Sequence, residues 1–252
     1  MMQIPSEKGI FRMSTQSQKL LMTISILLVC ALAGCGGSTT EGNTTAIVTP
    51  TSPAISTTPA AQFSVPATAR LVLSDPLKDK SKGYAWDETI QPAGSCGFAG
   101  SAYHIKALSL GLFTCNPEAK SLFLSNLVYE INLVAVQGNT EGVAFRFDQS
   151  NATGYIFFID TQGSYSLSAV NGLSIPSRTI TSGISKVIAK GAGQSNKLAV
   201  IADGNSISIY INHQFIAKAN DASYNQGQLG IFTVDSQSPT DVEASNAMAW
   251  TL

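Results

Sequence analysis

The residues best suited to chemistry in this chain lie between Glu141 and Leu167, in the stretch EGVAFRFDQSNATGYIFFIDTQGSYSL. Arg146 and Asp148 stand two positions apart there, and alternate residues of a strand point to the same face of its sheet. A guanidinium and a carboxylate on one face can make directed hydrogen bonds to a polar ligand. The same two groups can instead pair with each other on a solvated strand, where an ion pair stabilises little and binds nothing.

Other polar and aromatic residues join this face if the polar sides of neighbouring strands align on one sheet. The alternation places Phe145 and Phe147 together on the opposite side, in the core. Tyrosine rings stack on sugars, and Asp, Asn and Arg offer directional hydrogen bonds, so the mixture is typical of a carbohydrate site. The candidate ligand-binding residues are Arg146, Asp148, Asp160, Tyr165, Tyr210 and Asn212.

No catalytic constellation accompanies these residues. Retaining glycosidases use two carboxylates about 5.5 Å apart, and the sequence has no Glu-x-Asp-x-Glu run to supply them. The nearest acidic pairs are Asp87–Glu88, whose adjacent members point to opposite sides of a strand, and Asp241 with Glu243. Two histidines and no Gly-x-Ser-x-Gly give no support for a nucleophilic triad or a histidine metal site. We expect no catalytic residue, no cofactor and no metal, while a hydrolase site of unrecognised type and a structural calcium site stay open as alternatives.

Strands must position these residues. From Ala67 onward apolar residues recur at every second position, and no segment of ten residues keeps a helical period. Leu198–Ala219 reads as a three-stranded meander with turns at Asp203-Gly204-Asn205 and Asn212-His213, where His213 is expected to adopt a left-handed conformation. This pattern predicts an all-β, two-sheet antiparallel sandwich. Further expected strands are Arg70–Ser74, Tyr103–Ala107, Leu127–Val136, Gly142–Asp148, Tyr155–Asp160, Ser164–Val170, Lys186–Lys190, Gln228–Val234 and Val242–Thr251.

One longer segment resembles a known group of folds. NKLAVIADGNSISIYINHQFIAKANDASYNQGQLGIF is similar to a segment of concanavalin A-like jelly rolls, which laminin G-type modules and 3-keto-disaccharide hydrolase-type domains of bacterial exported proteins share. The strands around Arg146 resemble the same group, and CGFAGSAYHI followed by a second cysteine resembles bacterial ectodomains of this type. The resemblance covers roughly residues 75–252 and implies a concanavalin A-like jelly roll. It does not imply one activity, because function has to be argued from a site.

The N-terminus is typical of an export signal. Three cationic residues precede the apolar run Leu20–Gly34, which is shorter than the roughly 20 residues that a membrane-spanning helix needs. Its end, LAGC at Leu32–Cys35, resembles the lipobox of bacterial lipoproteins, which implies a diacylglyceryl group, with palmitate-type acyl chains, on Cys35. Such chains would anchor the protein at the extracytoplasmic face of the cell membrane. An ordinary signal peptide or a short membrane anchor is the alternative.

Three regions follow from this division: a lipoprotein signal peptide over residues 1–34, a tether over 35–66 and the sandwich over 67–252. The tether is rich in Thr, Ser and Pro, so we expect it to be disordered. Cys96 and Cys115 then remain as an even pair in an exported domain, which predicts a disulfide. Two metal-binding thiolates are the alternative, with His104 as their one nearby partner.

The charge balance narrows the partners. The chain has 15 Lys and Arg against 16 Asp and Glu, with no basic stripe, so we expect no nucleic acid partner. The expected protein is a lipoprotein attached to the membrane through Cys35, whose non-catalytic domain binds carbohydrate or cell-envelope glycan. One alternative is an exported sugar-processing hydrolase of the 3-keto-disaccharide hydrolase type. Another is a structural or sensory module that binds an envelope protein.

Overall fold

A computed structural model of the chain describes residues 62–172, 177–235 and 238–252. The predicted signal peptide, the lipobox with Cys35 and all but the last residues of the predicted tether lie outside these ranges, and they remain predictions. Within the ranges the helical structure consists of two single-turn 3-10 helices, η1 (Lys80–Lys82) and η2 (Lys120–Leu122). No helix of the described part is long and apolar enough to cross a membrane.

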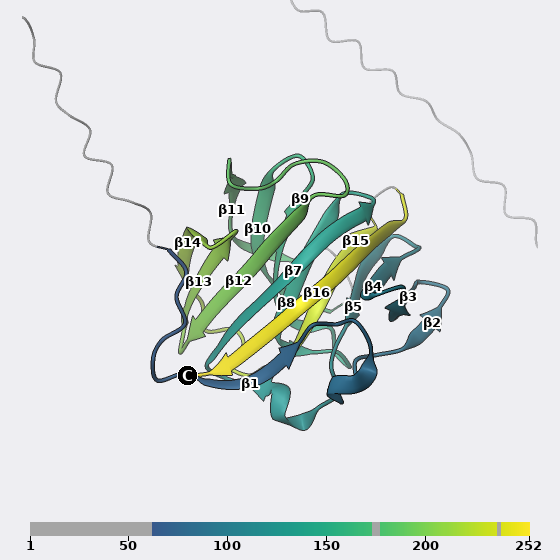
Figure 1. Cartoon of the computed structure of the whole chain (residues 1–252). Coiled ribbons are helices and arrows are strands. Elements are labelled where there is room, and N and C mark those ends of the chain that lie inside the picture. The colour runs from purple at the N-terminus through teal and green to yellow at the C-terminus, as the bar shows by residue number, and fades with distance from the viewer. Residues whose placement is uncertain (1–61, 173–176, 236–237) are drawn as a thin grey trace, which may run out of the picture. The chain divides into compact units, whose positions relative to one another are not determined.

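Sixteen strands of the described residues form two antiparallel sheets that pack face to face (Figure 1). The nine-stranded sheet has the order β14-β13-β12-β7-β16-β4-β3-β2, with β1 paired to β16, and the seven-stranded sheet has the order β11-β10-β9-β8-β15-β5, with β6 paired to β15. The strands of the nine-stranded sheet are β1 (Arg70–Asp75), β2 (Thr89–Gln91), β3 (Gly94–Ala99), β4 (Ala102–Ala107), β7 (Leu127–Gln137), β12 (Ser195–Asp203), β13 (Ser206–Ile211), β14 (Gln214–Asn220) and β16 (Thr240–Thr251). Those of the seven-stranded sheet are β5 (Gly111–Cys115), β6 (Phe123–Leu124), β8 (Thr140–Asp148), β9 (Thr153–Asp160), β10 (Ser164–Asn171), β11 (Arg178–Ile184) and β15 (Gly227–Asp235).

The alternating sequence pattern forms the core between the sheets. In β13, Ile207, Ile209 and Ile211 are fully buried, while Ser208 and Tyr210 between them are half-buried on the outer face. Each buried isoleucine contributes roughly 1.5–3 kcal/mol of apolar burial. The expectation of an all-β, two-sheet jelly-roll sandwich is confirmed.

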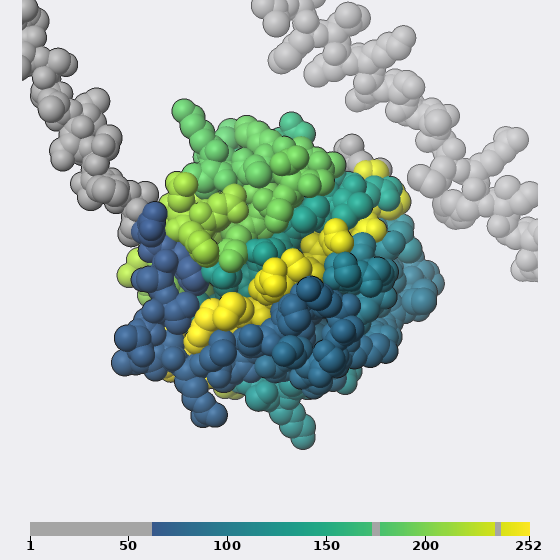
Figure 2. Space-filling view, viewed as in Figure 1, coloured from purple at the N-terminus to yellow at the C-terminus, as the bar shows by residue number. Residues whose placement is uncertain are grey.

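The predicted meander is present as β12, β13 and β14, which pair in sequence order. Asn212 and His213 have φ angles of +50° and +64°, so His213 does adopt the expected left-handed conformation. Figure 2 shows the outer face of the same sheet, where β16, in yellow, crosses between the green strands of the meander and the blue strands from the N-terminal part of the domain.

One expected strand is absent, because side-chain amides bind its backbone. Residues 186–190 form no strand, and β11 lies just before them instead. The Ala189 N–H donates to Asn196 Oδ1 at 2.8 Å, and Asn212 Nδ2 donates to the Val187 carbonyl at 2.8 Å. These backbone groups are therefore not available to a neighbouring strand.

The predicted disulfide between Cys96 and Cys115 is confirmed, with an S–S distance of 2.01 Å. Cys96 lies in β3 of the nine-stranded sheet and Cys115 ends β5 at the edge of the seven-stranded sheet. The bond therefore joins the two layers at the end of the sandwich where β2 and β5 lie. The sequence does not predict β2 and β5, because their short segments, TIQ and GLFTC, lack an apolar alternation.

Candidate functional site

Strand β8 changes face at Arg146. This residue has a φ of +47°, and the register between β8 and β9 shifts between Phe145 and Asp148. Phe145 consequently packs in the core between the sheets, whereas Phe147 packs with Ala144 on the outer face of the seven-stranded sheet. The expectation that Phe145 and Phe147 share a face is wrong, because a bulge inserts an extra residue that strict alternation does not count.

Two glycines on neighbouring strands allow this bulge. A Cβ added to Gly227 at the start of β15 would lie 2.3 Å from the carbonyl carbon of Arg146. A Cβ added to Gly154 in β9 would lie 2.7 Å from the Arg146 carbonyl oxygen. Both distances are far below van der Waals contact, so the β8 bulge requires glycine on either side.

Arg146 is buried rather than presented to a ligand. Arg146 is 2% exposed. Its Nε donates to the Ser125 carbonyl at 2.7 Å, and its Nη1 donates to the Tyr224 carbonyl at 3.2 Å. Burial lowers the pKa of Arg146 from its ordinary value. The side chain thus fastens two connections, the one between β6 and β7 and the one between β14 and β15, to strand β8.

The two candidate aspartates hold turns. Asp148 Oδ1 accepts hydrogen bonds from the backbone and hydroxyl of Ser150, at 2.9 and 2.5 Å, and its Oδ2 accepts from Asn151 Nδ2 at 2.7 Å. These bonds lower the pKa of Asp148, and the bond from the Ser150 side chain has the largest effect. Asp160 Oδ1 accepts from the backbone N–H groups of Gln162 and Ser164, both at 2.9 Å. This is the ordinary role of aspartate in tight turns.

The remaining candidates lie apart from these. Tyr165 is half-buried against the core between the sheets. Tyr210 lies in the nine-stranded sheet, where its ring packs edge-on against Phe63, with centroids 5.3 Å apart. Asn212 accepts from the Lys197 N–H at 2.8 Å in the turn after β13. The six candidates therefore belong to two sheets, and the structure does not bring them together on one face.

A second apolar cluster covers the outer face of the seven-stranded sheet. The rings of Phe158 and Phe232 lie 5.6 Å apart, and Ser166 and Ser168 of β10 follow beside them, paired with Phe158 and Ile156. This face therefore combines aromatic rings with hydroxyl groups. The cluster has a buried part, Ala144, Phe147, Ala152, Ile156, Val170 and Phe232, and a partly buried part, Leu112, Phe158 and Val234.

A groove of about 480 Å³ opens at the β5 end of this face. Leu112 and Phe147 belong both to the apolar cluster and to the groove, so the two are continuous. Hydroxyl, amide and carboxylate groups form the rest of its wall. The groove is lined by Asp87, Thr89, Gln91, Ala93, Leu112, Phe113, Thr114, Glu118, Phe147, Gln149 and Ala152.

The carboxylates of the groove are positioned by a backbone bridge next to the disulfide. Trp86 and Pro117 form an isolated antiparallel bridge, in which the Asp87 N–H donates to the Asn116 carbonyl and the Glu118 N–H donates to the Ala85 carbonyl, each at 3.0 Å. Cys115 directly precedes this segment, so the disulfide restrains it.

Asp87 is also held through its side chain. Its Oδ2 accepts from the Asn116 N–H at 2.9 Å and from Gln149 Nε2 at 3.1 Å. The second bond links the β2 side of the groove to the end of β8. The Asp87 carboxylate is therefore fixed in place before any ligand arrives.

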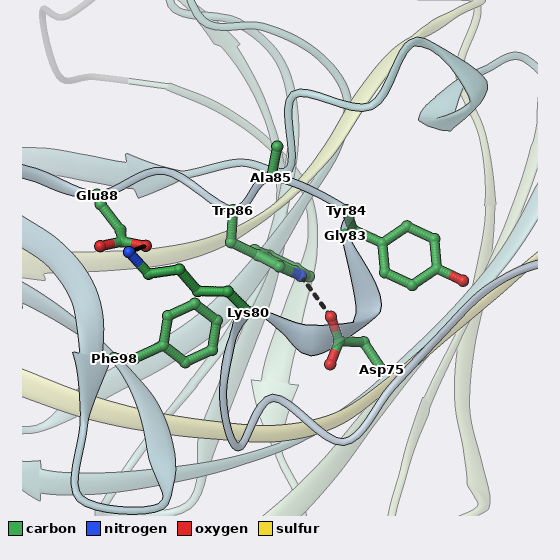
Figure 3. Close-up of a pocket in the computed structure, with 8 residues that line it drawn as sticks. All are labelled: Asp75, Lys80, Gly83, Tyr84, Ala85, Trp86, Glu88 and Phe98. Atoms are coloured by element: carbon green, nitrogen blue, oxygen red, sulfur yellow. Dashed lines mark hydrogen bonds and ion pairs between the residues drawn. The ribbon is translucent and has the colours of Figure 1, made fainter.

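A smaller hollow of about 140 Å³ lies on the other side of this segment (Figure 3). Trp86 lines it but is only 6% exposed, and its Nε1 donates to Asp75 Oδ2 at 3.1 Å. Lys80 Nζ and Glu88 Oε1 pair at 2.7 Å beside Phe98. Glu88 thus faces this hollow while Asp87 faces the groove, so the adjacent acids do point to opposite sides.

The described ranges contain no group of three or more His, Cys, Asp or Glu side chains that could hold a metal ion. His104 is bound through its Nδ1 to Asp241 Oδ1 at 2.9 Å on the outer face of the nine-stranded sheet. The groove is lined by carboxylate, amide, hydroxyl and apolar groups.

Neither a protein-family model nor a curated protein matches this sequence. Solved structures do match its fold. The carbohydrate-binding module CBM66 from Bacillus subtilis is 19% identical with a TM-score of 0.53, over 66% of this chain and 94% of the module. The fold is a galectin-like or concanavalin A-like jelly roll. A Bacillus subtilis protein of unknown function with a galectin-like fold has 14% identity and a TM-score of 0.53, over 72% of this chain and 97% of its own. The Bacillus licheniformis beta-glucanase has 11% identity and a TM-score of 0.50, over 73% and 99%.

The sequence does not predict the groove. It offers Asp87 only as the neighbour of Glu88 in an acidic pair. Glu118, Thr114 and Gln149 carry no motif, and they meet Asp87 only because the Trp86–Pro117 bridge and strand β5 bring distant segments together. The cysteine pair was the one sequence signal that pointed to this end of the domain.

Proposed function

We propose that this domain binds carbohydrate in the groove at the β5 end of the seven-stranded sheet and along the adjoining outer face. The observation that carries the proposal is the continuity of the groove with the apolar cluster: Leu112 and Phe147 belong to both, and Thr114, Gln149 and Asp87 line the polar side. Sugars present apolar C–H faces together with hydroxyl groups, so they require such a mixed surface.

The fold comparison supports the proposal without deciding it. A protein named as a carbohydrate-binding module and one named as a beta-glucanase share this jelly roll at low identity. Since one fold can host unrelated functions, the main support for carbohydrate binding is the groove.

The proposal also includes the place of action and the absence of catalysis. The chain acts at the extracytoplasmic face of the membrane, attached through a lipid on Cys35, and the domain retains a cell-envelope glycan rather than cleaving it. The resemblance to 3-keto-disaccharide hydrolase-type domains stays a prediction about the fold alone. Cleavage of a retained glycan would favour the hydrolase alternative, and retention of an envelope protein in place of a glycan would favour the module that binds a protein partner.

A glycan array probed with the full chain in detergent tests the proposal. We expect the double variant Gln149→Ala/Thr114→Ala to bind a retained glycan at least about tenfold more weakly, because two hydrogen-bonding groups are lost. Ser208→Ala, on the outer face of the nine-stranded sheet, is the matched control and should bind normally. Failure to retain any glycan, or equal binding by the double variant and the control, would contradict the proposal.

A further inference from the structure

We infer that the groove selects glycans that carry free amino groups over glycans that carry acidic groups. This inference rests on the proposed function and adds the chemical class of the ligand. It follows from the charges of the groove wall rather than from its shape.

The described residues that line the groove include two carboxylates and no cationic side chain. Asp87 and Glu118 supply the negative charge, and Lys, Arg and His are absent from the lining. Neither carboxylate forms an ion pair with a cation of the described chain. An ammonium group of a ligand would therefore meet negative charge that no internal cation has neutralised.

Three carboxylates elsewhere in the domain are already paired with cations. Asp221 pairs with Arg178, and Glu130 Oε1 lies 3.0 Å from Lys197 Nζ. Asp241 Oδ2 lies 3.0 Å from Lys106 Nζ. The groove thus differs from these places, where the protein supplies its own cation and a cationic ligand gains little.

The groove geometry strengthens the effect of the charge. The Asp87 Oδ2 atom is held by the Asn116 N–H and by Gln149, which leaves Oδ1 without a hydrogen-bond partner among the described residues. A carboxylate fixed in advance loses little conformational freedom when it binds a cation. In a partly enclosed groove its interaction with an ammonium group is screened less than on an open surface.

An acidic sugar meets the opposite situation. Its carboxylate or sulfate would enter beside Asp87 and Glu118 with no cation to accompany it. Like charges brought together in an interface disfavour binding and suppress the wrong partner. A glycan with amino groups is favoured, a neutral one is accepted through the apolar and hydroxyl contacts, and an acidic one is excluded.

The test is a titration of the full chain in detergent with three hexasaccharides: hexaglucosamine, its fully N-acetylated form and hexagalacturonate. At low salt and a pH that keeps the amines protonated, we expect hexaglucosamine to bind at least tenfold more tightly than the acetylated form. Hexagalacturonate should not bind. The preference should shrink as salt is added, because the attraction is electrostatic.

Variants assign the preference to the groove. Glu118→Gln changes an exposed side chain, and Asp87→Asn keeps an oxygen that can accept the Asn116 hydrogen bond. Each should lower the ratio of the hexaglucosamine affinity to the affinity for the acetylated form several-fold. Glu243→Gln, on the outer face of the nine-stranded sheet, is the control that should leave it unchanged.

The outcomes separate the two proposals. Equal or tighter binding of hexagalacturonate, or an amine preference that survives both groove variants, overturns this inference while carbohydrate binding stands. Absence of binding to all three oligosaccharides and to every glycan of the array overturns both.

Discussion

Arg146 donates hydrogen bonds to the carbonyl oxygens of two separate connections, so its removal should affect the fold before it affects any ligand. Arg146→Ala leaves the carbonyls of Ser125 and Tyr224 without these donors. An unsatisfied buried polar group costs about 1–3 kcal/mol, so we expect the free energy of unfolding to fall by about 2–4 kcal/mol. Urea unfolding monitored by circular dichroism measures the change. Arg70→Ala, at an exposed position of β1, is the control. If Arg146→Ala lowers the free energy of unfolding as little as Arg70→Ala does, the structural role of Arg146 is contradicted.

Glu141 makes the stability of the domain depend on pH near neutrality. This residue is 3% exposed, its Oε1 accepts from Asn196 Nδ2 at 3.1 Å, and its Oε2 has no partner within the described residues. Burial raises the pKa of Glu141 to about 7, even though the Asn196 hydrogen bond acts in the opposite direction.

Stability falls as pH rises because the folded state retains a proton that the unfolded state releases. Below about pH 4.5 the carboxyl is protonated in both the folded and the unfolded states. Between there and about pH 7 only the unfolded state releases the proton, so stability falls as pH rises, by on the order of 3 kcal/mol. We expect Glu141→Gln to match the wild type at pH 4.5 and to exceed it in melting temperature at pH 8. If the melting temperatures of the two proteins change with pH in the same way across this range, Glu141 is not the cause of the pH dependence.

At the level of elements, the Cys96–Cys115 disulfide joins the layers beside the groove. The cysteines are 19 positions apart, and a closed loop of this size stabilises by about 3 kcal/mol in the chain-entropy model. We expect the double variant Cys96→Ser/Cys115→Ser to lower the melting temperature and to weaken glycan binding, because Thr114 and the Asp87 segment lose their restraint. Thermal unfolding and glycan titration measure the two effects, and reduction of the wild type should reproduce them. A reduced protein with unchanged melting temperature and affinity would contradict this role.

Elements with a simple alternation could be predicted from the sequence, and those that depend on distant residues could not. The burial of Ile207, Ile209 and Ile211 follows from their spacing alone. The bulge at Arg146 depends on Gly154 and Gly227. These glycines lie on neighbouring strands, so the sequence around Arg146 does not predict the bulge. For the same reason the candidate face built on strict alternation placed Arg146 outside when it lies inside.

The candidate site shows the same division. Polar residues such as Asp148 and Asp160 looked like ligand contacts in the sequence, yet their oxygens bind turn N–H groups. The groove arises where the edges of two sheets meet, so it depends on topology that no short motif encodes. The disulfide was predictable because cysteine pairing in an exported domain is a chemical rule rather than a geometric one.

At the scale of the whole molecule, the described structure begins at the side of the nine-stranded sheet away from β2. Phe63 donates its N–H to the His213 carbonyl at 2.8 Å, and its ring stacks on His213 with centroids 5.5 Å apart. These contacts fall within the last residues of the predicted tether. β14, next to His213, and β2, beside the groove, are the opposite ends of the nine-stranded sheet, so the chain enters the domain far from the proposed site.

The lipid anchor is tested on the intact chain. We expect cells that express it to incorporate a fatty-acid probe into the protein, and Cys35→Ala to abolish the label, because the thiol is the proposed acceptor. Gel fluorescence after probe ligation measures incorporation. Cys30→Ala, in the predicted signal peptide, is the matched control and should retain the label; a label that persists in Cys35→Ala would refute the anchor.

The central claim is that the groove, and not the other sheet, holds the glycan. Hydrogen–deuterium exchange of the full chain, with and without a glycan retained on the array, tests it most directly. The account predicts slower exchange in peptides that cover 87–93 and 111–118, with no change in β13 and β14. Protection confined to β13 and β14 around Tyr210, or no protection anywhere, would contradict it.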